Sequence, residues 1–312
     1  MPGAYAHLTM VNQIKTPDAL DSIQGFTGPM KFAVTLWLKF LELGAVGPDY
    51  PYLSVLHHDA QHWADAMHHN RVGDRLKAGI EFVRGLTGPA RDKSFVWLLG
   101  FASHIATDVT IHPVVTEKVG EYEENKADHR TCEMHQDVHI FQQMQFGPIS
   151  QAELIRTRIG ACNAPGGDGT LDPDVLSTWE NMMTSVSDPA ERKEHPLDVN
   201  GWHRNFKSIL DKAEETSRLP ALARHVLDGL GIVYPRVDEV KQTYIKALKV
   251  PGGGVMHYDE IFQKALHNVR ALWSVVGRGC FGIDDEYERA IYNWDLDSGK
   301  RTEDGQLQYW SV

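Results

Sequence analysis

The sequence predicts an all-α protein, a bundle of many helices. Apolar residues recur at intervals of three and four along most long segments, as on the buried face of a helix. No segment alternates polar and apolar residues for long enough to predict a sheet. Histidines and carboxylates also repeat four residues apart, as in His104-x3-Asp108-x3-His112. Because residues i and i+4 share one face of a helix, this spacing is a third helical signal.

The first half is expected to form four helices and one rigid loop. An apolar run over 30–44 stops at Gly44, which is typical of a helix end. The sequence GPDYPY at 47–52 predicts a loop fixed by its two prolines. Further helices are predicted from about residue 54 through the histidine-rich stretch HHDAQHWADAMHHN, over 73–86, and from Asp92 to Pro113.

The second half predicts helices with a different character, because histidines become rare after residue 145. The glycine-rich sequences PGGDG and PGGG interrupt it as flexible loops. Helical patterns lie near 172–186, 200–230, 235–249 and 257–277, and the last twenty residues predict an irregular tail packed on the body. We expect a helical metal-binding core over 1–145. Residues 146–312 are expected to frame or cover the site within the same domain.

Composition restricts the function classes. The 312 residues are 42% hydrophobic and 23% charged, with a net charge of −11. Such a charge repels nucleic acid and anionic membranes, although bound metal cations would still attract an anionic substrate. The three cysteines argue against a disulfide scaffold. We found no signal peptide and no uninterrupted apolar stretch of about 18 residues. A cytoplasmic location is therefore expected, and signal-independent export stays open.

The histidines carry the functional signal. Ten of the sixteen fall between residues 57 and 139, interleaved with carboxylates. The comb His104, Asp108 and His112 lies on an otherwise apolar helix, and the pair His129-x3-Glu133 follows. A polar pair on an apolar face must be hydrogen-bonded or metal-bound to be tolerated. Imidazole and carboxylate together suit zinc, so the pattern favours a multinuclear metal hydrolase over a buried ion pair.

Several histidines have competing interpretations. His135 and His139 share the spacing of His129 and Glu133, but they project from another face of the helix. Of the cluster at 57–69, which contains His57, His58, His62, His68 and His69, only some members can be ligands. Asp49 is either a turn residue or a rigidly held ligand. His7 stands alone and is ordinary by itself.

Five ordered pieces of the first 140 residues resemble the zinc-dependent phospholipase C family, whose fold is shared with single-strand-specific zinc nucleases. The pieces are AHLTMVNQI, GPDYPY, AMHHN, LLGFASHIATDVTIHP and HRTCEMHQD. The resemblance implies an all-helical bundle around three zinc ions. It implies that one zinc is held by Asp49, His68, His104 and Asp108, a second by His112, His129 and Glu133, and a third by Asp108 and His7. His68, directly after Met67, is chosen over His69, which remains an alternative.

One departure affects the third zinc. Secreted members complete that site with an amino-terminal tryptophan, whereas here six residues precede His7 and none is tryptophan. The third ion is therefore held by another group, such as the amine of Met1 or Pro2, or is absent. Two or three zinc ions are expected.

The resemblance implies hydrolysis of a phospholipid or another phosphate ester, with release of the glycerophospholipid head group as the family default. Asp49 would also serve as the general base that orients water. Tyr50 and Trp63 are candidate substrate-binding rings. The alternatives are a nuclease or nucleotidase on the same scaffold and a non-catalytic, zinc-stabilised interaction protein. The sequence does not indicate the oligomeric state.

Overall fold

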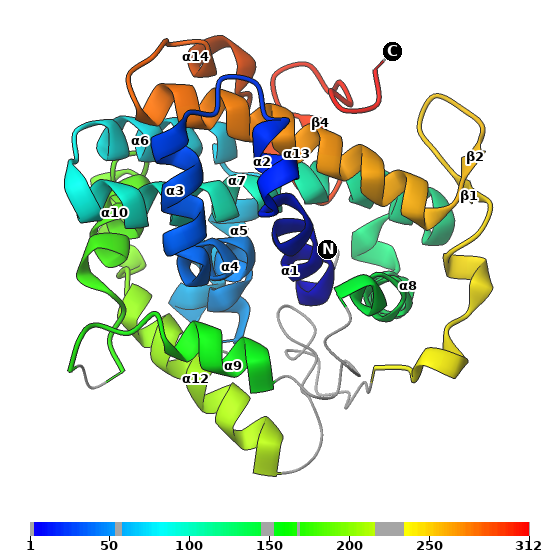
Figure 1. The fold of residues 1–312 in the computed structure, drawn as a ribbon. Helices are drawn as coiled ribbons and strands as arrows, with labels where there is room; N and C mark the ends of the chain where they lie inside the picture. The colour runs from blue at the N-terminus through cyan, green and yellow to red at the C-terminus, as the bar shows by residue number, and fades with distance from the viewer. Residues whose placement is uncertain (1–2, 54–57, 145–152, 167–168, 216–233, 312) are drawn as a thin grey trace.

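The computed structural model describes residues 3–53, 58–144, 153–166, 169–215 and 234–311. This part of the chain is largely helical, which confirms the predicted all-α class (Figure 1). Its strands form two short antiparallel pairs, β1 with β2 and β3 with β4. The α-helices are α1 (Ala4–Ile14), α2 (Pro17–Asp21), α3 (Gly28–Leu36), α4 (Leu38–Val46), α5 (His58–His69), α6 (Val72–Arg84), α7 (Gly88–Val119), α8 (Lys126–Phe141), α9 (Glu153–Gly160), α10 (Pro173–Thr184), α11 (Pro189–Glu194), α12 (Val199–Glu215), α13 (Tyr258–Cys280) and α14 (Tyr287–Ala290). The 3-10 helices and strands are η1 (Gly47–Leu53), η2 (Tyr122–Glu124), η3 (Gln142–Met144), η5 (Val237–Glu239), η6 (Gln242–Tyr244), β1 (Leu248–Lys249), β2 (Val255–Met256), β3 (Trp294–Asp295) and β4 (Lys300–Arg301).

Helix α7 is the central element of the molecule. It packs against α4 and α13, which lie on different sides of it (Figure 1). Two glycines permit the close crossing with α4: a Cβ at Gly44 would lie 2.0 Å from the carbonyl oxygen of Trp97, and one at Gly100 would lie 2.2 Å from that of Leu41. On the α13 side, the indole of Trp273 donates to the Leu99 carbonyl at 2.9 Å. These contacts fix the helix that carries the histidine comb.

Helix α7 continues past Pro113, so the predicted end at that residue is wrong. Proline removes one backbone donor and costs about 3 kcal/mol inside a helix. The next turn is nevertheless buried, since Val114 is 1% and Val115 0% exposed, and its packing offsets that loss. Gly299 lies against the proline, because a Cβ there would meet the Pro113 ring at 2.5 Å.

Helix α7 is also long and apolar enough to cross a membrane by length and composition. Its apolar window is wholly buried inside the structure, and it is the single such helix found in the described residues. Complete burial by neighbouring helices is what a core helix of this composition requires.

Two other predictions in the first half need correction. The run over 30–44 forms two helices, α3 and α4, because the backbone at Trp37 leaves the helical region. Phe32 and Leu36 on α3 are exposed, whereas α4 is buried from Phe40 to its end. The expected loop at 47–52 is the 3-10 helix η1.

In the second half, the helices predicted near 172–186 and 257–277 correspond to α10 and α13. The prediction over 200–230 covers α12, and its later part lies outside the described residues. The helix predicted over 235–249 is wrong: this segment forms η5, η6 and β1. Ala247 has a φ of 51°, in the left-handed region that ends a helix.

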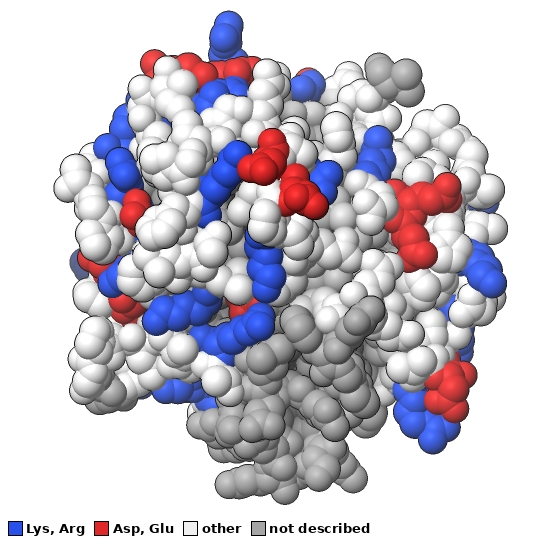
Figure 2. Space-filling model, viewed as in Figure 1, with Lys and Arg blue, Asp and Glu red and all other residues white. Residues whose placement is uncertain are grey.

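The hairpin formed by β3 and β4 packs against α5 and α6, and Gly299 in its turn lies against Pro113 of α7. On the face drawn in Figure 2, acidic and basic side chains are interspersed among the described residues. No continuous basic stripe crosses the described part of that face. The negative net charge is therefore not expressed there as a single acidic patch.

Candidate metal centre

The comb on α7 is buried at the centre of the fold. His104, Asp108 and His112 follow one another at four-residue spacing, and each is at most 1% exposed. The close crossing with α4 brings the Ala45 carbonyl to 2.9 Å from His104 Nδ1. A carbonyl oxygen only accepts hydrogen bonds, so Nδ1 carries the hydrogen. Nε2 of His104 is then the ring nitrogen that can coordinate a metal ion.

Three further predicted ligands lie beside the comb, namely His7 from α1, Asp49 from η1 and His68 from α5. His7 Nε2 lies 3.2 Å from Asp108 Oδ1, and His104 Nε2 lies 3.2 Å from Asp108 Oδ2. Asp49 Oδ1 is 3.4 Å from His68 Nε2 and 4.0 Å from His104 Nε2. The rings of His7 and His104 are stacked at 4.0 Å. One carboxylate is thus shared by two histidines, and a second carboxylate adjoins the next pair.

The facing nitrogens of His68 and His104 are the most informative feature of this group. His68 Nδ1 donates to the Ala64 carbonyl at 2.7 Å, as His104 Nδ1 does to Ala45. The two remaining Nε2 atoms face each other at 3.3 Å. In neutral rings both would present lone pairs, which repel. A proton or a metal cation between them removes that repulsion.

A second group forms where α7 meets α8. His112 Nε2 and His129 Nδ1 lie 3.9 Å and 3.8 Å from the same oxygen, Oε1 of Glu133. Each ring is held from behind by a backbone carbonyl: His112 Nδ1 donates to Leu296, and His129 Nε2 donates to Gly120 at 2.6 Å. Backbone or carboxylate acceptors behind the ring are typical of metal-binding histidines, because they fix the tautomer.

The chemistry of these donors fits divalent cations. Within the part of the chain that the structure describes, both oxygens of Asp49 and Asp108 are buried without a hydrogen-bond partner, as are His112 Nε2 and His129 Nδ1. Burial alone would raise the pKa of both carboxylates, but His104 and the neighbouring histidines outweigh it and lower the pKa values. Two ionised carboxylates in a buried space demand a compensating positive charge. Zinc accepts this mixture of imidazole and carboxylate oxygen.

The pKa values of the histidines also respond to the two buried carboxylates. Burial by itself lowers the pKa of His104, but Asp108 and Asp49 outweigh it and raise the pKa to about 9. In contrast, burial lowers the pKa of His112 to about 4. Without a metal, His104 therefore holds a proton between the carboxylates, while His112 presents a neutral ring.

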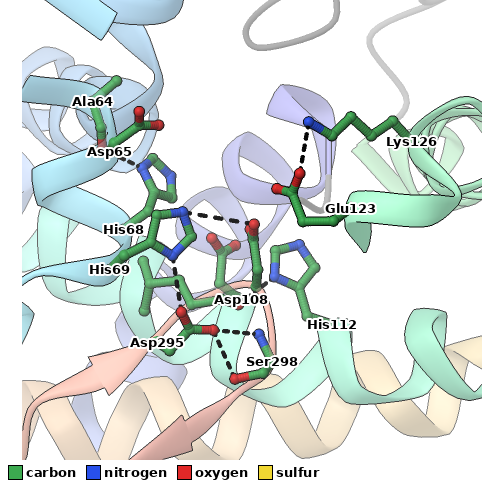
Figure 3. Close-up of polar contacts among 12 residues, drawn as sticks. Ala64, Asp65, His68, His69, Asp108, His112, Glu123, Lys126, Asp295 and Ser298 are labelled. Carbon is green, nitrogen blue, oxygen red and sulfur yellow. Dashed lines mark hydrogen bonds and ion pairs between the residues drawn. The ribbon is translucent and has the colours of Figure 1, made fainter. Parts of the chain in front are cut away.

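The structure places His68, rather than His69, in this group. His69 Nδ1 lies 3.0 Å from Asp295 Oδ2, and its Nε2 lies 3.6 Å from Asp297 Oδ2 (Figure 3). Asp295 in turn accepts from Ser298 within the turn of the β3–β4 hairpin. The adjacent residues His68 and His69 on α5 thus contact different parts of the fold, because successive residues of a helix point about 100° apart.

The hairpin contacts the centre through its backbone as well. The Leu296 N–H donates to the His68 carbonyl at 2.8 Å, and the Leu296 carbonyl accepts from His112. Leu296 is fully buried. A segment of the second half therefore holds two of the candidate ligands in place.

The competing pair His135 and His139 points away from the centre. His135 Nδ1 accepts from the Lys241 N–H at 3.1 Å. His139 Nε2 lies 2.7 Å from Asp259, and together with His257 these side chains form a half-exposed group that could hold a metal. The contact of 2.7 Å is a satisfied hydrogen bond that joins α8 to α13.

The remaining candidates lie in other surroundings. His62 bonds Glu191 at 2.9 Å on the side of α5 away from His68. His57 lies outside the described residues, as do Met1 and Pro2, whose amines were considered for a third zinc. For His58 the structure describes only the backbone.

The two candidate substrate rings are in the core. Tyr50 and Trp63 are 0% exposed. The Tyr50 ring stacks on Phe206 at 4.2 Å, and the Trp63 indole donates to the His195 carbonyl. Such rings stabilise the bundle by packing, and substrate contact by either of them stays a prediction that their burial does not favour.

Comparison with known proteins identifies the chain at the level of a family. The model of the zinc-dependent phospholipase C family matches residues 6–189, more than half of the chain. No curated protein and no solved structure matches it. The resemblance inferred from five short pieces of sequence is thereby confirmed. The matched region contains all eight candidate ligands and ends before α12.

Proposed function

The chain belongs to the zinc-dependent phospholipase C family, and from that premise we propose that it hydrolyses glycerophospholipids at the phosphodiester. Water adds to phosphorus and the bond to the glycerol oxygen breaks. The products are diacylglycerol and the phosphorylated head group. A proton passes from the water to the departing glycerol oxygen, so the reaction needs no other reactant.

We propose three subsites for metal ions. Asp49, His68, His104 and Asp108 would hold one zinc, and His112, His129 and Glu133 a second. Asp108 and His7 would provide part of a third. The observation that carries this proposal is the pair of facing Nε2 atoms of His68 and His104, 3.3 Å apart beside the Asp49 carboxylate.

Bound zinc would lower the pKa of a water from 15.7 to about 7 and stabilise negative charge on phosphoryl oxygens. The protein's contribution is positional. The carbonyls behind His68 and His104 keep both rings in one tautomer, so their Nε2 atoms are presented without rotation. Such preorganisation avoids rearrangement of the side chains during the reaction.

Asp49 is the proposed residue that orients the attacking water. The two prolines of GPDYPY hold its backbone in η1, and its Oδ2 has no hydrogen-bond partner in the described ranges of the chain. His104 and His68 outweigh the effect of burial and keep its pKa below the usual value, so it is ionised at neutral pH. An ionised carboxylate accepts a hydrogen bond from water and directs the oxygen lone pair toward phosphorus.

Burial of the ligands favours one competing function, a structural zinc site. His68, His104 and Asp108 are 0% exposed, as in closed sites where protein groups fill every coordination position. The two functions differ in their products. A structural site stabilises the fold without turnover, whereas the proposed enzyme also cleaves phosphodiesters.

The test is hydrolysis of a chromogenic choline phosphodiester by the zinc-loaded protein, with zinc per chain measured on the same sample. Asp49→Asn is compared with wild type, and His139→Ala serves as a surface control. We expect wild type and the control to hydrolyse the substrate. The folded Asp49→Asn variant should hydrolyse it about 100-fold more slowly, or slower still. Single-stranded DNA is offered in parallel. Zinc-loaded protein that cleaves neither substrate supports the structural site, and cleavage of DNA alone supports the nuclease alternative.

A further inference from the structure

Asp137 on α8 is a buried carboxylate that the proposed reaction does not use. It is 0% exposed and receives three hydrogen bonds. The Ala6 N–H donates to it at 2.9 Å, the Tyr5 N–H at 3.3 Å, and the Tyr234 hydroxyl at 3.0 Å. Two of the three donors are backbone groups in the first turn of α1.

These contacts make Asp137 the cap of α1, supplied by a helix 131 residues away. The residue at the N-cap position is Gly3, which has no side chain to accept hydrogen bonds from the N–H groups of the first turn. Space also requires glycine, because a Cβ at Gly3 would lie 1.9 Å from Asp137 Oδ2. The position of α1 is therefore set by α8.

Local capping residues such as serine or asparagine satisfy a helix N-terminus more cheaply than a buried carboxylate. Burial raises the pKa of Asp137 to about 7, against the effect of its three donors. The side chain thus occupies this place at an energetic cost. A cap that also ties α1 to α8 performs a task that no local residue can.

The candidate ligands lie on the same two helices. His7 follows Ala6 directly on α1, and Glu133 precedes Asp137 by one turn on α8. Asp137 therefore fixes the distance between the helix that carries His7 and the helix that carries Glu133. The two residues belong to different proposed subsites, so the tie sets how those subsites lie relative to each other.

His7 depends on such an anchor more than the other histidines do. His68, His104, His112 and His129 each bond a backbone carbonyl through one ring nitrogen. Among the described residues neither ring nitrogen of His7 has a hydrogen-bond partner, although Nε2 lies 3.2 Å from Asp108 Oδ1. Its placement rests on the backbone of α1 and on stacking against His104.

We propose that Asp137 is a positioning residue, which holds the first turn of α1 so that His7 reaches Asp108 and the metal ion they share. The inference rests on the metal centre of the proposed function but not on turnover.

The test compares Asp137→Ala, Asp137→Asn and Tyr234→Phe with wild type. Gln13→Ala is the control, since Gln13 is on α1 and its side chain donates to the exposed side chain of Gln143 at 2.8 Å. Each protein is stripped of metal and titrated with Co²⁺, whose visible absorption reports its ligands, and bound cobalt per chain is measured. Hydrogen exchange of residues 4–14 is followed with and without the metal.

We expect Asp137→Ala to bind one ion fewer than wild type, or to bind it at least tenfold more weakly, with a changed cobalt spectrum. Metal should no longer slow exchange in α1. Asp137→Asn keeps an acceptor for the Ala6 N–H, so it should bind the metal ion as wild type does. Tyr234→Phe removes one of the three donors to Asp137, so its affinity for the metal ion should lie between those of wild type and Asp137→Ala. Should the Ala variant fail to fold, the Tyr234→Phe titration decides by the same criteria.

The inference would be overturned if Asp137→Ala bound as much cobalt as wild type, with the same visible spectrum, and differed only in a lower melting temperature. Asp137 would then be a helix cap alone. Wild type that binds metal but hydrolyses nothing removes the proposed activity while this inference stands. The two failures are therefore distinguishable.

Discussion

Removal of metal should destabilise this protein strongly, because its centre is built from buried polar atoms that lack hydrogen-bond partners in the described part of the chain. Eight side-chain atoms of the candidate ligands are buried without a hydrogen bond to any described residue. They are both ring nitrogens of His7, both oxygens of Asp49 and of Asp108, Nε2 of His112 and Nδ1 of His129. Each such atom costs about 1–3 kcal/mol when it is left unsatisfied.

The lower limit of that range already gives a large effect. One zinc ion that satisfies four of the atoms would contribute about 4 kcal/mol, within a total stability of roughly 5–15 kcal/mol for a typical protein. At about 2–4 °C per kcal/mol, the melting temperature should fall by roughly 8–16 °C on loss of that ion.

The assay is calorimetric melting of the zinc-loaded protein and of the same sample after chelation and dialysis, with residual zinc measured. His104→Ala should melt near the metal-free wild type and respond little to zinc. His139→Ala, whose ring pairs with Asp259 at the surface, should keep the full response. A wild-type melting temperature that changes by no more than about 2 °C after verified removal of zinc would contradict this prediction, since that shift corresponds to at most about 1 kcal/mol.

Three further predictions follow from individual side chains. The pKa of His104 is raised to about 9 in the metal-free protein, so zinc binding should release a proton from this ring, and the apparent dissociation constant for zinc should fall about tenfold per pH unit from pH 7 to pH 9. Calorimetric titration in buffers of different ionisation enthalpy measures the proton release, and zinc uptake without it would contradict the prediction. By linkage, the raised pKa also stabilises the metal-free fold below pH 6.5, and this contribution is lost as the pH rises through 9, which pH-dependent urea unfolding detects. His68→Ala should lose at least one zinc per chain whereas His69→Ala keeps all of them, because His69 pairs with Asp295 and Asp297; equal zinc content in the two variants would contradict the assignment.

The sequence indicates the helical class and the residues of the centre because both depend on local spacing. His104, Asp108 and His112 can be grouped from four-residue intervals alone, since a helix fixes their common face. The division of roles between His68 and His69 follows equally from helix geometry, but only the fold shows which of the two points inward.

Other features depend on contacts between distant segments and leave no local pattern. The acceptors behind the histidine rings are backbone carbonyls of Ala45, Ala64, Gly120 and Leu296, and any residue type supplies a carbonyl. Asp137 resembles any acidic residue on α8 until the first turn of α1 is placed against it. A clue was available in Gly3, which leaves the start of α1 without a side-chain cap.

Tertiary packing also explains the wrong helix predictions. Pro113 predicts a helix end, but the buried valines that follow it keep α7 intact. The segment 235–249 contains apolar residues at helical intervals, but few of them are buried, so no packed face stabilises a helix there.

The most direct measurement is anomalous diffraction at the zinc edge from crystals of protein purified with zinc. We expect one peak bounded by His68 Nε2, His104 Nε2 and Asp49, and a second beside His112, His129 and Glu133. Crystals with no zinc at these positions, or with zinc only at surface groups such as His139 and Asp259, would contradict this expectation.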